Sequence, residues 1–407
     1  MSVAYITSLY PSLSHSFILR EVRALRDLGV DVHTFSVRRT PEEQLIAPED
    51  REEAARTRVL LPPDRVHLAA ATGRAMAADP ARFARITGGA VGRGGKLGPR
   101  AALWQAFYVA EAVLLWDECR RLGVRHVHAH FANVGADVAQ LVAALGGPGW
   151  SWSFTMHGPT EFFDVPGHRL ADKTADAAFV ACISDFCRSQ LMKLVDRSEW
   201  DKLALVRCGV DPEVYAPVPP AADDGVLKVL CVGRLVPDKG QSLLVDAIGM
   251  LRQRGVPAEL TLVGDGPDRR HLEDHVGASR LGEAVHLAGA VGQDTIRGYY
   301  ADADVFCLPS FAEGVPVVLM EAMAMGIPVV TTRIAGIGEL VEDGVSGTLV
   351  RPGRADMLAD ALQALTDPEL RRTMGTHGRA MVREEFDVQR SARRLAELFA
   401  GTPGNRA

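Results

Sequence analysis

Residues 228–240 read Lys-Val-Leu-Cys-Val-Gly-Arg-Leu-Val-Pro-Asp-Lys-Gly. The mostly apolar start predicts a short buried strand, and the glycine that follows predicts a turn at the carboxyl end of that strand. Open α/β sheets bind ligands at this edge. Glycines let a ligand approach the backbone closely, and the cations Arg234 and Lys239 can neutralise a diphosphate. The stretch therefore predicts an α/β fold with an anion-binding turn.

The same alternation of strand-like and helical patterns covers almost the whole chain, which predicts parallel βαβ units. A proline-rich stretch interrupts it at residues 217–225, the best linker candidate in the sequence. We therefore predict a doubly wound domain over 1–216, a linker over 217–225, a second doubly wound domain over 226–385 and a helical segment over 386–407 that returns to the first domain. The predicted strands are 3–8, 30–37, 126–130, 153–157, 178–183 and 203–207, then 228–232, 259–263, 285–287, 305–308, 329–332 and 348–350.

The composition is that of an ordinary globular protein. The chain has 407 residues, 47% hydrophobic and 24% charged, so about two domains are expected. A net charge of -6 argues against nucleic acid as a partner. The six cysteines form no C-x-x-C pair, which favours reduced thiols and a cytoplasmic protein. The N-terminus reads as a strand and lacks the pattern of a signal peptide.

A segment at 310–328 carries two carboxylates eight residues apart. Glu321 lies in an apolar run that reads as a buried helix, where a carboxylate needs a polar partner. Glu313 precedes that helix in a turn with Gly314 and Pro316, and the amides at a helix start favour anions. Together these features suggest a sugar-nucleotide site.

Two further turns close predicted strands in the second half. Residues 263–267 read Val-Gly-Asp-Gly-Pro, half of a G-x-G-x-x-G fingerprint. A tight turn into a helix explains Gly264 at least as well as ligand contact does. Residues 287–291, which end at Val291, are candidates to offer backbone groups to a base.

In the first half, His157 stands at the carboxyl end of a predicted strand and is followed by glycine, which favours ligand contact over a core position. Residues 14–16 (Ser14, His15 and Ser16) open the first helix, either as simple caps or as groups facing a cleft. The alternating histidines of 126–130 share one strand face. We found no matching carboxylate or cysteine pattern, so no metal site is predicted. Residues 302–304 (Asp-Ala-Asp) are expected to end a helix rather than bind metal.

Residues 82–100 are basic and glycine-rich, and an aromatic-apolar helix follows over 104–116. Such a segment can contact a membrane surface or an anionic acceptor. A solvated arginine face beside a core helix is the alternative.

Taken together, these residues resemble the retaining glycosyltransferases of family 4, which have the GT-B fold. The resemblance covers nearly the whole chain. The E-x7-E element is met by Glu313 and Glu321. The opening of the chain resembles the subgroup acting in exopolysaccharide synthesis, of the colanic-acid transferase type, which commonly has Glu where this chain has His15. The G-R-x4-K-G element is met by Gly233, Arg234, Lys239 and Gly240.

The resemblance implies an α/β, GT-B architecture in which two doubly wound Rossmann-like domains face each other across a cleft. It implies that Arg234 and Lys239 bind the donor diphosphate and that Glu321 holds the ribose. Glu313 would bind sugar hydroxyls, and His157 would lie beside the transferred sugar. The implied donor-side residues are Gly233, Gly264, Val291, Gly314, Val315, Pro316, Val317 and Glu321, the acceptor-side candidates are Ser14, His15, Ser16 and Glu161, and Ser184 and Arg207 match less specific positions.

The implied activity is transfer of a sugar from a nucleoside-diphosphate sugar to a small-molecule or glycan hydroxyl. UDP-sugar is the favoured donor, with GDP- or TDP-sugar as alternatives, and no cofactor is expected. Fixed cations in a dry cleft would stabilise the leaving phosphate without a metal ion. No residue stands out as a covalent nucleophile, so same-face attack would retain configuration. The rivals are a GT-B disaccharide phosphorylase, a sugar-nucleotide epimerase and a non-catalytic binder. Peripheral contact with the inner face of the membrane through 82–116 is a further hypothesis.

Overall fold

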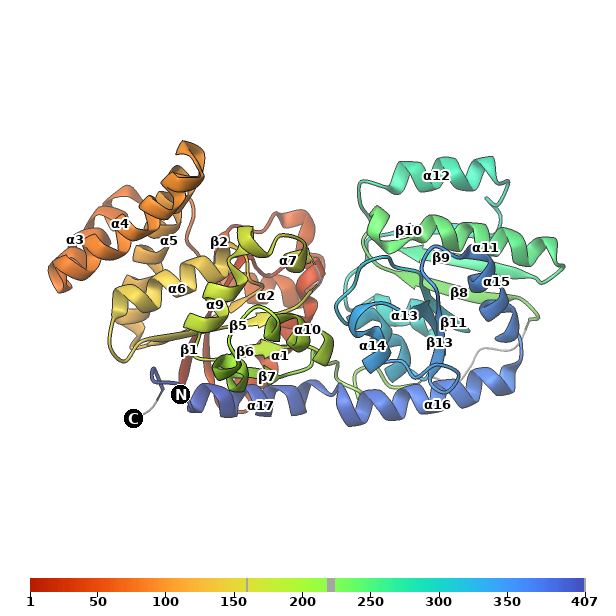
Figure 1. Cartoon of the computed structure of the whole chain (residues 1–407). Helices are drawn as coiled ribbons and strands as arrows, with labels where there is room; N and C mark the ends of the chain where they lie inside the picture. The colour runs from red at the N-terminus through yellow and green to blue at the C-terminus, as the bar shows by residue number, and fades with distance from the viewer. Residues whose placement is uncertain (159, 218–223, 406–407) are drawn as a thin grey trace. The chain divides into compact units, whose positions relative to one another are not determined.

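The structure is a computed structural model that describes residues 1–158, 160–217 and 224–405. By its internal contacts the chain forms two compact units (Figure 1). Of the predicted linker, 218–223 lie outside the described residues. The first unit comprises 1–183, 187–206 and 392–407, and the second comprises 184–186 and 207–391.

The first unit is built on a seven-stranded sheet in the order β3-β2-β1-β4-β5-β6-β7, with every pair of neighbours parallel. The six strands predicted for this half are all present. The edge strand β3 was not predicted, because two residues are too short for a periodic signal. The strands are β1 (Ser2–Leu9), β2 (Asp31–Arg38), β3 (Arg58–Val59), β4 (His126–His130), β5 (Ser151–Met156), β6 (Val180–Cys182) and β7 (Leu203–Leu205).

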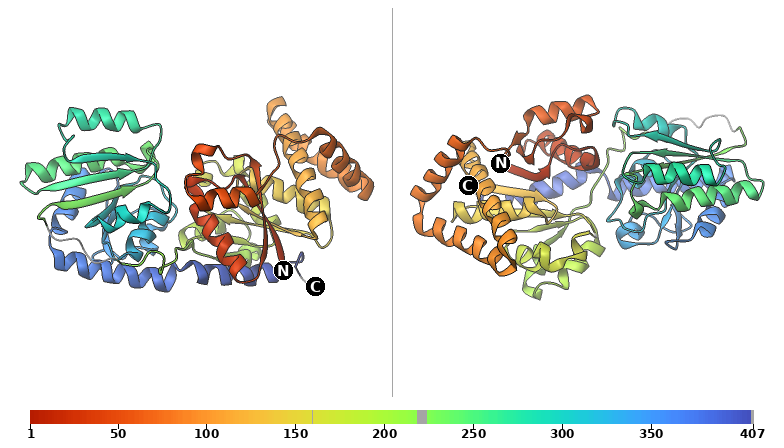
Figure 2. Two further views of the ribbon diagram at one scale, coloured as in Figure 1. Left: turned by 180° about the vertical axis from the view of Figure 1, so that it is seen from behind. Right: turned by 90° about the horizontal axis from the view of Figure 1, so that it is seen from above.

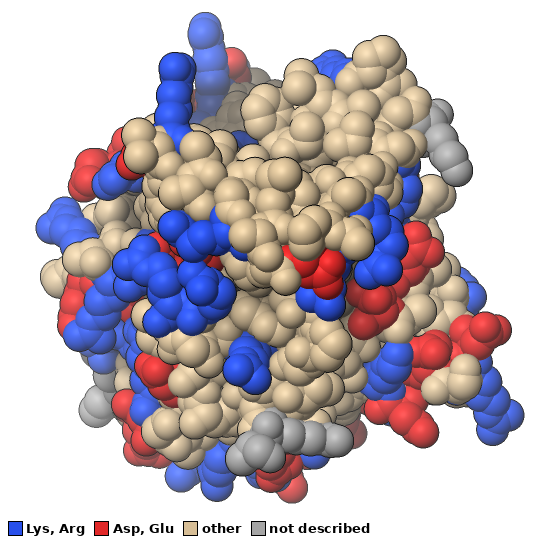
Figure 3. Space-filling view, turned by 90° about the vertical axis from the view of Figure 1, so that its left-hand side faces the viewer, with Lys and Arg blue, Asp and Glu red and all other residues tan. Residues whose placement is uncertain are grey.

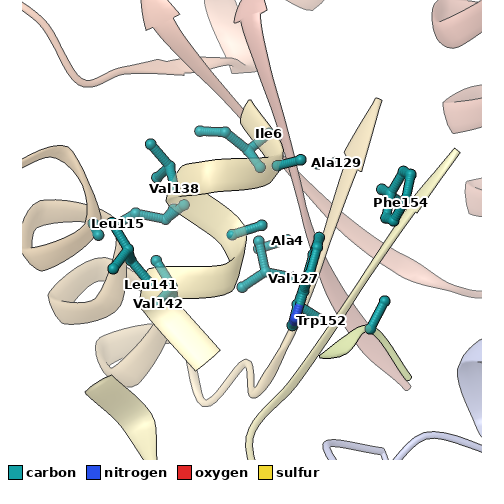
Figure 4. Close-up of a cluster of buried hydrophobic side chains, with 14 of the residues drawn as sticks. Ala4, Ile6, Leu115, Val127, Ala129, Val138, Leu141, Val142, Trp152 and Phe154 are labelled. Carbon is teal, nitrogen blue, oxygen red and sulfur yellow. The ribbon is translucent and has the colours of Figure 1, made fainter. Parts of the chain in front are cut away.

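Helices cover both faces of this sheet (Figure 2). On one face, α6 packs between the sheet and α5, and its Val138 and Leu141 lie on the side of Leu115 of α5 (Figure 4). On another part of the sheet, Phe399 of α17 contacts Tyr5 of β1, with ring centroids 6.1 Å apart. The helices are α1 (Ser16–Asp27), α2 (Pro48–Arg56), α3 (Arg65–Ala78), α4 (Pro80–Leu97), α5 (Pro99–Leu122), α6 (Val134–Gly146), α7 (Thr160–Phe163), α8 (Val165–His168), α9 (Leu170–Asp176), α10 (Asp185–Met192) and α17 (Val388–Ala400).

The second unit has a six-stranded parallel sheet in the order β10-β9-β8-β11-β12-β13. Each sheet thus contains the 3-2-1-4-5-6 strand order of a doubly wound fold. In this order, strands are added to one side of the first strand and then, from the fourth strand on, to its other side. The boundary between the first and fourth strands is called the switch point. In the second unit this switch point lies between β8 and β11. The strands are β8 (Leu227–Val232), β9 (Ala258–Val263), β10 (Val285–Gly289), β11 (Val305–Leu308), β12 (Val329–Thr332) and β13 (Gly347–Val350).

All six strands predicted for the second unit are present, because each is an apolar run bounded by glycine, proline or aspartate. The main segment of the unit begins at Arg207, before the predicted linker, and Val210 forms a bridge with Asp387 near the end of that segment. Its helices are α11 (Gln241–Gln253), α12 (Arg269–Ala278), α13 (Ile296–Ala301), α14 (Val317–Ala324), α15 (Ala355–Ala364) and α16 (Pro368–Glu385).

Candidate active site

The switch point of the second unit brings Lys239 and Glu313 together. Lys239 ends the short 3-10 helix η4 (Pro237–Lys239) after β8, and Glu313 lies in the loop after β11. Lys239 Nζ is 2.5 Å from Glu313 Oε1, and the hydroxyl of Ser310 donates a hydrogen bond to the same oxygen at 2.7 Å. Gly240 has φ +65° and its Cβ would lie 2.4 Å from Pro309 O, so glycine is needed where the two loops meet.

Arg234 occupies the same turn but is exposed. Its carbonyl accepts a hydrogen bond from Gln241 Nε2 at 3.0 Å, which fixes the turn. Among the described residues, no ion pair or hydrogen bond engages its guanidinium. The turn therefore presents one cation that is paired with a carboxylate and one that faces solvent.

Glu321 is buried in α14, as predicted, and has the polar partners that burial demands. Tyr300 of α13 donates a hydrogen bond to Glu321 Oε2 at 2.8 Å, and Tyr215 Oη lies 3.1 Å from Oε1. The sequence predicted a partner but not these tyrosines. No local motif marks either tyrosine. Tyr300 is one of the buried residues of α13, and Tyr215 lies in an irregular segment before the predicted linker.

Glycines allow close backbone contacts around this switch point. Gly264 has φ +142°, and its Cβ would be 2.0 Å from Gly233 O. Gly264 is therefore required by the turn itself, and this packing explains it without a ligand. The N–H of Gly336 donates to Gly314 O at 3.2 Å, which holds the loop before α14. Val291 follows β10, where no described contact links it to Lys239 or Glu313.

Residues 315–317 lead into α14. Val315 is buried, Pro316 is extended, and the helix begins at Val317. The first-turn amides of a helix lack intrahelical acceptors. The loop that carries Glu313 therefore leads directly into amides that have no acceptor within the helix.

In the first unit, His157 follows β5 and is buried between Phe17 and Phe131, with ring centroids 4.7 Å from each. Its Nε2 lies 2.8 Å from Nδ1 of His130. Burial, with the nearby His130 and His15, holds the pKa of His157 well below its usual value. The ring is therefore a neutral imidazole at physiological pH.

The histidines of β4 have a carboxylate neighbour that the sequence analysis missed. Glu21 Oε1 of α1 lies 3.2 Å from His130 Nε2, and the ligand atoms of Glu21, His128 and His130 all lie within 4.8 Å of one another. Glu21 and His130 are far apart in sequence, and they meet because α1 brings Glu21 to His130 of β4. Both nitrogens of His128 already lie within 2.9 Å of the hydroxyls of Ser153 and Thr155, so the group fits a hydrogen-bonded network better than a metal site.

The interpretation of residues 14–16 as helix caps is wrong for the two side chains that the structure describes. His15 is the N-cap residue of α1 but makes no side-chain cap hydrogen bond, because its ring Nδ1 lies 3.2 Å from Leu9 O instead. Ser16 is the first residue of the helix, and the side chain of Ser14 lies outside the described residues. Glu161 is buried, and its Oε1 lies 3.4 Å from the backbone N of Ala132.

Two other predicted positions have structural partners. Arg207 Nη1 is 2.9 Å from Glu339 Oε2, and that carboxylate also accepts the backbone N–H groups of Asp185 and Phe186 at 2.8 Å. Ser184 is buried beside them. As predicted, Asp302 ends α13, and Asp304 Oδ2 accepts the N–H of Lys228 at 2.9 Å.

The basic segment forms α4 and the start of α5. From 80 to 110 the chain has five basic residues and no acidic one. Leu103, Trp104 and Phe107 on α5 are exposed, and the rings of Trp104 and Phe107 lie 5.8 Å apart in a tilted arrangement. Figure 3 shows this side of the molecule, where Lys and Arg side chains gather. Within the described residues, we find no helix long and apolar enough to cross a bilayer.

Comparison with known proteins identifies the family. Residues 227–367 match the model described as Glycosyl transferases group 1. The chain is 30% identical to a protein of Escherichia coli K12 named as a colanic acid biosynthesis glycosyltransferase, WcaL, over 98% of this chain and 99% of that protein. The chain belongs to the group 1 glycosyltransferases. The amylovoran biosynthesis glycosyltransferase AmsK of Erwinia amylovora is 28% identical to this glycosyltransferase over similar lengths, 98% and 99%.

Solved structures confirm the GT-B fold of the glycosyltransferase. Sucrose-phosphate synthase of Thermosynechococcus elongatus aligns with a TM-score of 0.74 and 23% identity over 98% of each chain. HepE of Anabaena, solved in complex with UDP and glucose, aligns with a TM-score of 0.74 and 19% identity over 99% of this chain and 100% of its own. The predicted family and fold are therefore both correct.

Proposed function

We propose that this glycosyltransferase moves a sugar from a nucleoside-diphosphate sugar to a hydroxyl acceptor, with retention of configuration and without a metal ion. One observation carries the proposal: Lys239 meets Glu313 and Ser310 at the carboxyl ends of two adjacent strands. A cation and a carboxylate held this way at a switch point suit a ligand that combines a diphosphate with sugar hydroxyls.

Lys239 and Arg234 would neutralise the charge that grows on the leaving diphosphate as the sugar becomes oxocarbenium-like. Fixed cations do this without reorganising at the moment of reaction. When the diphosphate binds, Lys239 would be shared between a phosphate oxygen and Glu313, whose second oxygen would accept a sugar hydroxyl. The acceptor would attack the anomeric carbon on the face the diphosphate leaves, and a phosphate oxygen would take the acceptor's proton.

Three further groups would contact the donor. Glu321, held by Tyr300 and Tyr215, would accept hydrogen bonds from the ribose hydroxyls. The amides at the start of α14 would bind phosphate or sugar oxygens. His157, as a neutral imidazole, would accept a hydrogen bond from a hydroxyl of the transferred sugar.

We infer a UDP-sugar as the first donor to test. HepE has been solved in complex with UDP-glucose. A GDP-mannose-dependent phosphatidylinositol monomannoside mannosyltransferase of Mycolicibacterium smegmatis is 34% identical over 56% of this chain and 63% of its own length. A GDP-sugar is therefore the second donor to test. The full-length relatives are named for colanic acid and amylovoran synthesis, which favours a growing glycan as the acceptor.

A thermal-shift screen against UDP-, GDP- and TDP-sugars tests the donor, because a ligand that binds only the folded state raises Tm. Transfer to a saccharide panel then tests the reaction, with NMR of the product anomer for retention and EDTA for metal independence. Epimerised donor, or phosphate-dependent cleavage of a disaccharide, would instead support the epimerase or the phosphorylase. Binding without transfer would support a non-catalytic role.

We also propose that α4 and the start of α5 contact an anionic membrane surface on the cytoplasmic side. Exposed aromatic side chains that follow a run of basic residues combine apolar insertion with attraction to anionic headgroups. Flotation with phosphatidylglycerol vesicles should recover the protein, and phosphatidylcholine vesicles should not. Trp104→Ser together with Phe107→Ser should abolish flotation. Unchanged flotation of that variant would exclude this surface.

A further inference from the structure

The residue that follows β4 has a strained backbone. Phe131 has a φ of +66°, in the left-handed region that glycine adopts readily. A bulky side chain is crowded there, because its Cβ approaches the neighbouring carbonyl oxygen. Such a conformation persists only where the surrounding contacts hold it, and residues of this kind concentrate at functional sites. We therefore asked what holds Phe131 and what its ring touches.

Contacts on both sides of residue 131 hold the strained conformation. The N–H of Phe131 donates a hydrogen bond to Thr155 O of β5 at 2.9 Å. The next N–H, that of Ala132, donates to Glu161 Oε1 at 3.4 Å, and the carbonyl of Ala132 accepts a hydrogen bond from Lys173 Nζ at 2.7 Å. Three successive peptide groups are thus tied to other elements of the first unit, which fixes φ and ψ of Phe131.

The lysine in this set is buried and has no role in the proposed transfer. Lys173 of α9 is only 1% exposed. A buried ammonium needs a polar or charged partner, and its Nζ lies 3.0 Å from Oδ2 of Asp137 in the first turn of α6. Burial lowers the pKa of Lys173, and the charge of Asp137 opposes this effect. Both described contacts of the ammonium are therefore with the segment that follows β4.

The backbone conformation of Phe131 decides where its ring points. The ring centroid lies 4.7 Å from that of His157 and 5.2 Å from that of His15, and Phe131 is partly exposed. The ring thus lies beside both the histidine proposed to contact the transferred sugar and an acceptor-side candidate. Aromatic side chains commonly line the binding sites of small molecules. A partly exposed ring can pack against the apolar C–H face of a sugar.

We propose that Phe131 contacts the acceptor sugar and that Lys173 is a positioning residue that holds Phe131 in its left-handed conformation. The inference rests on the proposed function, which supplies the acceptor. Lys173 would act through the carbonyl of Ala132 without touching the acceptor. Because the ring is already oriented in the free protein, binding would not have to order this segment.

Stability measurements test the strain without any substrate. Phe131→Gly should unfold at a higher temperature than Phe131→Ala, because glycine adopts a positive φ without crowding. Phe179 is a buried phenylalanine of the same unit with an ordinary φ. There the order should reverse, because glycine only adds freedom to the unfolded chain. A Phe131→Gly protein no more stable than Phe131→Ala would overturn the strain on which the proposal depends.

Transfer kinetics test the contact with the acceptor, with the saccharide that reacts fastest in the acceptor panel as the probe. Phe131→Ala should raise the acceptor KM by about threefold to tenfold, the loss of one aromatic contact. The donor KM should change by less than about twofold, because the ring does not touch the donor nucleotide. Phe179→Ala is the control for lost packing and should keep both KM values. An unchanged acceptor KM in Phe131→Ala would overturn the contact.

A double-mutant cycle tests the positioning role. Lys173→Met removes the ammonium and keeps a long side chain, and it should raise the acceptor KM. In a Phe131→Gly protein there is no ring to orient, so Lys173→Met should add no further rise. Asp137→Asn weakens the hold on Lys173 and should give a smaller rise if Lys173→Met does not fold. Equal rises with and without the ring would overturn the role of Lys173. If the order of Tm is as stated but no donor binds and no saccharide reacts, the strained turn stands and the proposed function fails.

Discussion

Under the proposed function, the ion pair between Lys239 and Glu313 would prepare the donor-binding site. Glu313 is nearly buried and receives two donors on one oxygen, while Lys239 keeps a quarter of its side chain exposed. The pair holds the cation beside the loop amides before any ligand arrives, which lowers the cost of ordering it later. This is the kind of preorganisation that stabilises charge in a transition state.

Removal of the Lys239 ammonium should therefore cost much of the activity. Lys239→Ala is expected to lower kcat/KM by about a hundredfold to a thousandfold, on the order of 3 kcal/mol. Steady-state transfer kinetics measure this. Lys228→Ala is the matched control, since Lys228 lies on β8, the strand that precedes Lys239, and pairs with Asp224 at the surface; this variant should turn over normally. Full turnover by Lys239→Ala would contradict the assigned role.

The two tyrosines around Glu321 lead to a second prediction. Tyr300→Phe removes one hydroxyl donor from a buried carboxylate, so Glu321 should be held less firmly. We expect the Kd for the nucleoside diphosphate to rise by about fivefold to tenfold, from the loss of a hydrogen bond of about 1–1.5 kcal/mol. Isothermal titration calorimetry measures it. Tyr299→Phe removes a hydroxyl one residue earlier, and an equal rise in that variant would rule out an effect through Glu321.

At the level of single residues, the sequence predicted kinds of contact better than partners. A carboxylate in an apolar helix demands a polar neighbour, so the burial of Glu321 and its need for donors could be foreseen. The identity of Tyr215 and Tyr300 could not, because each lies on a different segment and only packing joins them. For the same reason Glu21 was missed beside His130, although the face shared by the β4 histidines was predicted correctly.

At the level of elements, the turn after β9 depends on a glycine with no side chain. Gly264→Ala would place a Cβ 2.0 Å from Gly233 O at φ +142°, so both sterics and backbone strain oppose it. We expect a clear loss of Tm by calorimetry. Gly277→Ala in α12 has open space and ordinary helical geometry, and should raise stability by up to about 1 kcal/mol. A Gly264→Ala protein as stable as the wild type would show that this turn is pliable.

Helix α5 carries a buried carboxylate that should make stability depend on pH. Burial raises the pKa of Glu111 to about 7 in the folded protein, despite the opposing charge of Arg38, and its Oε2 has no hydrogen bond among the described residues. Because the folded state binds this proton more tightly than the unfolded state, its contribution is favourable below about pH 4.5 and is lost as the pH rises to about 7.

Glu111→Gln should remove this penalty. We expect the variant to be more stable than the wild type at pH 8, by at most on the order of 3 kcal/mol, with the difference shrinking toward pH 5. Urea unfolding at a series of pH values measures it. Glu43→Gln, at an exposed position of the same unit, should leave the curve unchanged. A Glu111→Gln difference that stays constant with pH would mean that packing, not titration, is responsible.

At the level of the whole molecule, the alternation of apolar runs was enough to predict two doubly wound units, because buried parallel strands leave a strong and repeated signal. The exact division of the chain was harder to predict. Residues 207–216 look like the end of the first half in sequence, but their contacts, such as the Val210–Asp387 bridge, belong to the second unit. Composition identifies segments rich in proline and glycine, but contacts between residues far apart in sequence decide where one unit ends and the next begins.

The final prediction uses this division. The residues proposed to bind the diphosphate and ribose (234, 239 and 321) all belong to the second unit, whereas His157 belongs to the first. In hydrogen exchange, UDP alone should therefore protect amides at 233–240 and 310–321 and leave 126–158 unchanged, since ligands protect what they bind. The intact donor sugar should add protection at 154–158. Protection by UDP at 126–158 with none in the second unit would contradict the assignment, because the nucleotide would then be held by the wrong unit.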